Sequence, residues 1–69
     1  MTNTKLLNEK IKSSGLKREY IAKELGITRQ SFTMKINNES FFNQPQIQKL
    51  CDILNITSLS EKDMIFFAN

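Results

Sequence analysis

Only two glycines and one proline interrupt this chain of 69 residues, and this scarcity constrains its fold more than any other feature. The glycines stand at Gly15 and Gly26, and Pro45 is the single proline of the second half. A fold of many short strands needs frequent turns, and turns rely heavily on glycine and proline. The sequence therefore predicts a few helices that are joined by short connections.

The length of the chain limits how the fold can be stabilised. A domain of this size buries only about 60% of the surface of its unfolded chain, so it usually needs disulfides, a metal or regular helix packing. One cysteine cannot form an internal disulfide, and a chain without histidine offers no plausible zinc ligand set. We therefore expect a single domain, residues 1–69, that is held together by helix packing, with or without dimerisation.

Apolar residues recur at helical spacing in five segments, and helix-ending residues flank them. Thr28, Asn43 and Ser58 each precede a segment and can accept hydrogen bonds from its first turn. Gly15 and Gly26 suit the left-handed position that ends a helix. No segment alternates at a period of two residues, so we expect an all-α fold, a compact bundle of five short helices. The predicted helices cover residues 4–14, 17–25, 29–37, 43–54 and 58–68.

Several classes of protein are disfavoured by what the sequence lacks. No run of 18 apolar residues could span a membrane, and the N-terminal segment lacks the apolar core of a signal peptide. A single thiol without an export signal indicates a reducing cytoplasm. Cys51 lies in the apolar stripe of the fourth predicted helix, which indicates a core residue rather than a redox sensor. Without histidine or a catalytic motif, we expect no enzyme activity, metal, cofactor or small-molecule ligand.

Charge is distributed unevenly along the chain. Residues 1–36 carry eight Lys or Arg and three Asp or Glu, a net charge of +5, whereas residues 37–69 carry two and four, a net charge of −2. A basic N-terminal half is typical of a surface that binds a polyanion such as nucleic acid. The alternative is that these lysines and arginines only solvate the helix surfaces.

The segment IAKELGITRQSF, residues 21–32, joins the second and third predicted helices. Two helices linked by three or four residues can cross steeply where small residues permit close approach, and Ala22 is small at the expected crossing. Gly26 can adopt the positive φ of a sharp corner. Ile27 can cover the apolar side of this corner while Phe32 packs back onto the second helix. The segment therefore predicts a helix-turn-helix.

A corner of this kind does not by itself explain Arg29 and Gln30. In a helix-turn-helix, the N-terminal residues of the second helix meet base edges in the major groove. Arginine can bind guanine O6 and N7, and glutamine can bind adenine N6 and N7. Thr33 and Met34, one turn later, are further candidates for base contacts. The alternative is that Arg29 and Gln30 form a solvated helix start.

Residues 15–38, GLKREYIAKELGITRQSFTMKINN, resemble the helix-turn-helix of the lambda-repressor/Cro-type (xenobiotic response element) family. The usual family pattern is Gln-x-x-Leu-Ala, three further residues and Gly-Ile/Val-Ser/Thr. The resemblance extends over nearly the whole chain and implies a five-helix bundle whose second and third helices form the motif. It also implies a sequence-specific, double-stranded DNA-binding transcriptional regulator, a small phage or prophage repressor or Cro-like protein. The matching positions are Ile21, Ala22, Gly26, Ile27, Thr28 and the buried Phe32.

The resemblance also implies which residues contact phosphates, at the start of the second helix and around the third. Arg18 stands where the family commonly has glutamine, which adds a charge at this contact. The family usually has its next apolar residue three positions after the one that matches Phe32, whereas here Ile36 follows at four. The rotation of the third helix therefore stays open, and with it whether Thr33 or Met34 faces the bases. The candidate phosphate contacts are Lys17, Arg18, Thr28, Lys35, Asn37 and Asn38.

Large apolar residues cluster near the C-terminal end, at Ile65, Phe66 and Phe67. They can either cover the small core or form the interface of a homodimer, which would suit a palindromic DNA site. The expected partners are accordingly double-stranded DNA and a second copy of the chain. The alternative function is a protein-interaction module on the same fold, such as an antirepressor or an antitoxin.

Overall fold

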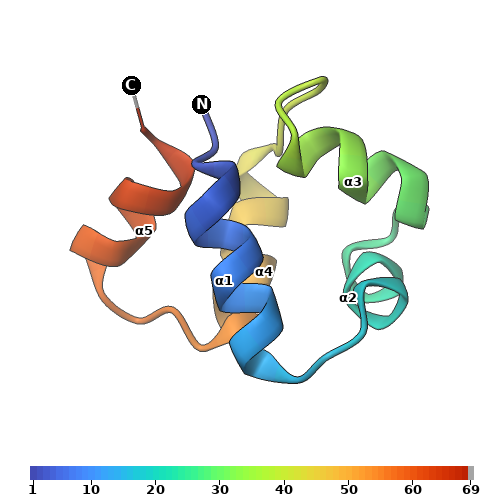
Figure 1. The fold of residues 1–69 in the computed structure, drawn as a ribbon, viewed down its shortest axis with the longest axis horizontal. Helices are drawn as coiled ribbons and strands as arrows, with labels where there is room; N and C mark the ends of the chain where they lie inside the picture. Colours follow the sequence, from blue (N-terminus) through green and yellow to red (C-terminus); the bar gives the residue numbers. More distant parts are fainter. Residues whose placement is uncertain (69) are drawn as a thin grey trace.

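The computed structural model of the protein describes residues 1–68, and over these residues the chain forms five helices and no strand (Figure 1). Helix α1 contacts α3, α4 and α5, while α2 packs against both α3 and α4. The prediction of an all-α fold with five short helices is confirmed. None of the helices in this described part is long and apolar enough to cross a membrane. The helices are α1 (Thr4–Ser14), α2 (Arg18–Leu25), α3 (Arg29–Ile36), α4 (Gln44–Leu54) and α5 (Leu59–Phe66).

Local sequence signals set where the helices begin. The side chains of Thr28, Asn43 and Ser58 accept hydrogen bonds from the backbone N–H three residues later, at 3.0, 2.9 and 3.3 Å. These bonds satisfy N–H groups that a first helical turn leaves without intrahelical partners. Helices α2, α4 and α5 each begin one residue later than predicted, because the first residue of each predicted range is the N-cap. Lys17, the N-cap of α2, makes no such side-chain bond.

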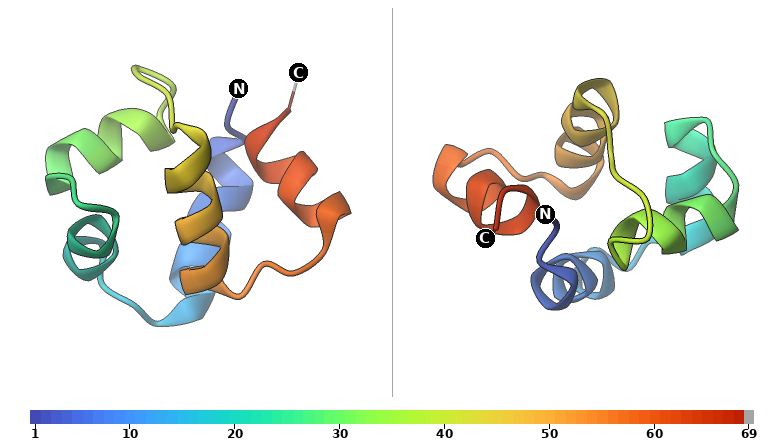
Figure 2. Two further views of the ribbon diagram at one scale, coloured as in Figure 1. Left: turned by 180° about the vertical axis from the view of Figure 1, so that it is seen from behind. Right: turned by 90° about the horizontal axis from the view of Figure 1, so that it is seen from above.

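Helix ends also follow local signals, with two small differences from prediction. Gly15 and Gly26 terminate α1 and α2, each with a φ of 74°, in the left-handed region that glycine adopts without strain. Helices α3 and α5 end one and two residues earlier than predicted, at Ile36 and Phe66. Beyond α5 the chain turns to pair with the N-terminal segment, where the N–H of Ala68 donates to the carbonyl of Met1 at 3.0 Å. Figures 1 and 2 show the end of α5 beside the start of α1.

A single apolar core lies between the helices. The ring of Phe42 packs edge-on against Phe32 of α3 and against Phe66 of α5, with ring centroids 6.1 and 6.0 Å apart. Cys51 is buried in this core, as predicted. Burial raises the pKa of the Cys51 thiol, although the nearby Lys62 offsets part of the rise. Cys51 therefore serves as a packing residue of the core.

The N-terminal segment ties the end of α3 to the end of α5. The Asn38 amide accepts a hydrogen bond from the N–H of Thr2 and donates one to its carbonyl, both at 2.9 Å. One residue later, the N–H of Asn3 donates to the carbonyl of Ile65 at 2.6 Å. Asn38 has a φ of 64°, a conformation that asparagine tolerates better than most residues. The Asn38 side chain and the backbone of residues 2 and 3 therefore link the end of α3 to the end of α5.

Candidate functional site

Helix α3 has one buried and one exposed face. Phe32 and Ile36 are 0% and 2% exposed and pack into the core. The exposed side chains lie at positions 29, 30, 33, 34 and 37, a helical spacing that places them along one surface. All four residues predicted to contact bases therefore share the exposed face. These exposed residues are Arg29, Gln30, Thr33, Met34 and Asn37.

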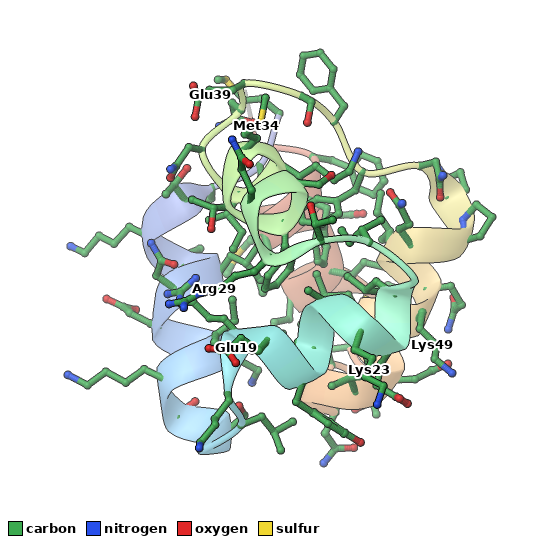
Figure 3. The ribbon with its side chains drawn as sticks, turned by 90° about the vertical axis from the view of Figure 1, so that its right-hand side faces the viewer. Glu19, Lys23, Arg29, Met34, Glu39 and Lys49 are labelled. Atoms are coloured by element: carbon green, nitrogen blue, oxygen red, sulfur yellow. The ribbon has the colours of Figure 1, made fainter. Side chains whose placement is uncertain are left out.

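A shallow pocket of about 300 Å³ opens between α1, α2 and α3. Thr33 lines this pocket together with Arg18 and Arg29, whereas Met34 lies beside Glu39, at the turn that follows α3 (Figure 3). The structure thus brings Thr33, rather than Met34, next to the two arginines. The complete lining is Asn8, Arg18, Arg29, Thr33, Ile36 and Asn37, four of which were predicted to contact DNA.

Both arginines of this pocket are held by side chains from other helices. Nη2 of Arg18 donates to Oδ1 of Asn8 on α1 at 2.8 Å. Nη1 of Arg29 lies 3.2 Å from Oε1 of Glu19 on α2, and the two side chains point toward each other in Figure 3. Asn8 and Glu19 were not predicted as site residues. Each lies ten positions from its partner on a different helix, so only the tertiary fold reveals the contact.

The joint between α2 and α3 spans residues 26–28. Ala22 is buried, and its carbonyl accepts a hydrogen bond from the N–H of Ile27 at 3.0 Å. A Cβ added at Gly26 would meet no heavy atom within 4 Å, so this position favours glycine for its positive φ and not for lack of space. In Figure 1, α2 is seen nearly along its axis while α3 runs across the view, so the two helices cross.

The other candidate phosphate contacts occupy varied surroundings. Lys17 is exposed before the first turn of α2, next to Arg18. The ammonium of Lys35 donates to the carbonyl of Phe41 at 3.0 Å, within the turn after α3. Both polar atoms of the Asn38 amide are bonded to the backbone of Thr2. The structure therefore gives the Asn38 side chain a role in anchoring the N-terminal segment.

Two of the three residues predicted for a dimer interface belong to the core. Ile65 and Phe66 are 2% and 4% exposed, so they cover the core of a single chain and offer no surface to a partner. Phe67 is 46% exposed, and Met64 on the same side of α5 is 55% exposed. Both line an open pocket of about 450 Å³ that also includes Leu6 of α1. An interface at this end of the molecule would therefore use Phe67 and Met64.

Comparison of the chain with protein-family models, curated proteins and solved structures gave no match. Its function is therefore inferred from its own side chains and their arrangement. The principal features are a row of exposed hydrogen-bonding residues on α3 and a pair of arginines that border the same pocket.

Proposed function

We propose that the chain is a sequence-specific, double-stranded DNA-binding transcriptional regulator of the lambda-repressor/Cro type. In this proposal α2 and α3 form a helix-turn-helix, and α3 enters the major groove. The observation that carries it is the exposed start of α3, where Arg29 and Gln30 are exposed and where Arg29 and Thr33 share a pocket with Arg18. Arginine and glutamine are the side chains that bind guanine and adenine in bidentate fashion, and base contacts in this motif come from the start of its second helix.

The beginning of α2 suits a phosphate of the same DNA. Within residues 1–68, the other helices each begin with a side chain that accepts a backbone hydrogen bond, but α2 does not. Its first N–H groups are therefore open to an external acceptor, and the helix dipole favours an anion there. Lys17 and Arg18 add two positive charges at the same point. Phosphate contacts of this kind fix the orientation of the protein on the duplex.

We expect binding to duplex DNA to weaken steeply with salt, by about 0.9 in log K per unit of log salt for each phosphate neutralised. Arg18→Gln keeps a hydrogen-bond donor but removes a charge, so it should lower this slope by about one unit per protomer. It should also lower the affinity for duplexes of every sequence by the same factor. The matched control is Lys49→Gln, which removes the same charge from α4, on the right of Figure 3, where Arg29 lies on the left. Fluorescence anisotropy with labelled duplex, from about 50 to 200 mM salt, measures both slopes.

The two substitutions distinguish a phosphate contact at Arg18 from a general effect of positive charge on the chain. Equal slopes for Arg18→Gln and Lys49→Gln would show that positive charge anywhere on the chain suffices, and would contradict the proposed orientation. Absence of duplex binding even at low salt would favour a protein-interaction module on the same fold. A largely apolar protein interface would respond little to the same salt series.

We further propose that the regulator binds DNA as a homodimer through Met64 and Phe67. A two-fold dimer presents two copies of α3 to the two halves of a palindromic site. Phe67→Glu should shift the chain to monomer, because a charge buried at an interface without a partner is strongly unfavourable. Phe41→Glu places the same charge at an exposed phenylalanine between α3 and α4 and should leave the dimer intact. Sedimentation equilibrium distinguishes these outcomes, and a dimer that survives Phe67→Glu would contradict this interface.

A further inference from the structure

Glu19 is an acidic residue in the middle of a basic surface. Lys17 and Arg18 precede it, and its carboxylate lies 3.2 Å from the guanidinium of Arg29. The two side chains are 61% exposed for Arg29 and 70% exposed for Glu19, so water screens the pair and it contributes little to folding stability. Its effect on what Arg29 can bind is larger than its effect on the fold.

Arg29 lies between two hollows of the surface. On one side it lines the pocket that holds Arg18 and Thr33. On the other it lines an open hollow of about 540 Å³ along the joint of α2 and α3, together with Glu19 and Thr28. The second hollow also contains Glu19, whose carboxylate lies 3.2 Å from the guanidinium. A side chain held by such a partner loses less conformational freedom when it forms a further contact.

The chemistry of the pair favours a base over a phosphate. A guanidinium has five N–H donors, and the hydrogen bond to Glu19 uses one of them, which leaves donors for O6 and N7 of guanine. A phosphate brought to the same guanidinium would also approach the Glu19 carboxylate, and two anions repel each other. Binding without sequence preference depends on phosphate contacts, so the carboxylate weakens that mode more than it weakens base recognition.

We propose that Glu19 is a specificity-determining residue of the DNA-binding site, which positions Arg29 for a guanine and disfavours phosphate at the same place. This inference rests on the proposed function, since it concerns the choice among DNA sequences. Glu19 acts through Arg29 and is a positioning residue. Its contribution is therefore a change in the ratio of specific to non-specific affinity, which a purely structural role would leave unchanged.

Glu19→Gln tests the proposal, because it keeps the shape of the side chain and removes its charge. The probes are a duplex selected by the wild-type protein from a random library and a random-sequence duplex, titrated at one salt concentration. We expect the ratio of the two affinities to fall by about 2- to 10-fold, the lower part of the range for directly coupled side chains, because the pair is exposed. The matched control is Glu24→Gln, which also removes one negative charge from α2. Glu24 lines a pocket with Asn43 and Lys49, so this variant should leave the ratio of affinities unchanged.

The same substitution in an Arg29→Ala background completes the experiment. If Glu19 acts through Arg29, Glu19→Gln should not alter the ratio once the guanidinium is absent. If Arg29→Ala lowers the ratio but Glu19→Gln in the otherwise wild-type chain does not, the proposed function stands and the role of Glu19 is overturned. If the wild-type protein prefers no duplex over another, both the proposed function and the role of Glu19 fail.

Discussion

Replacing Phe32 with alanine is expected to unfold much of the protein at 25 °C. Phe32 is completely buried on the inner face of α3, and its ring packs edge-on against Phe42. Removing a buried phenylalanine side chain costs about 3–5 kcal/mol. A chain of this length has a free energy of unfolding of about 3–10 kcal/mol, so one substitution removes a large part of it. Urea titration followed by far-ultraviolet circular dichroism measures the loss.

Phe41 provides a matched control for this prediction. It is 70% exposed, so Phe41→Ala makes the same chemical change at a position that buries little surface. We expect the free energy of unfolding of this variant to stay within about 0.5 kcal/mol of the wild-type value. Equal losses for Phe32→Ala and Phe41→Ala would contradict the view that Phe32 anchors α3 to the core.

The second large effect is expected at Arg29 and concerns DNA recognition. Arg29→Ala should cost about 1–3 kcal/mol, which is about 5- to 150-fold in affinity, for duplexes that carry a guanine at the contacted position. Discrimination at that one base pair should be lost, because no other side chain replaces the bidentate donor. The variant should remain folded, since its ion pair with Glu19 is exposed. Titration of the selected duplex and of its variants at single base pairs measures the effect.

Arg18→Gln is the natural comparison for Arg29→Ala. Both remove one arginine of the same pocket, but the proposal assigns Arg18 to a phosphate and Arg29 to a base. The Arg18 variant should therefore bind every duplex less tightly and keep its ranking of sequences. If both variants lower the affinity for all sequences by the same factor, the assignment of α3 as the base-contacting helix is wrong.

The helices could be predicted from the sequence because the signals that define them act over a few residues. Thr28 and Asn43 bond to backbone groups three positions away, and Gly26 ends α2 through its own φ angle. The buried face of α3 follows in the same way from Phe32 and Ile36, four residues apart. Signals of this range can be identified before any tertiary contact is known.

The candidate site was only partly predictable, because its charges are arranged by contacts between helices. The partner of Arg29 is Glu19, which in the sequence resembles any other solvated helix residue. The sequence predicts Asn38 as a phosphate contact and gives no sign that its amide is bonded to Thr2, 36 positions away. Ile65 and Phe66 suited a core or an interface equally well, since burial within one chain or between two demands the same apolar side chains.

The central claim, that this chain recognises a specific sequence of duplex DNA through α3, is tested most directly by selection from a random duplex library. The enriched duplex would then be retested with the wild-type protein and with Arg29→Ala. We predict enrichment of a site with two-fold symmetry, bound in a salt-dependent manner, whose preference for guanine is relaxed by Arg29→Ala. A library that stays unenriched, or a chain that retains no duplex at low salt, would contradict the claim.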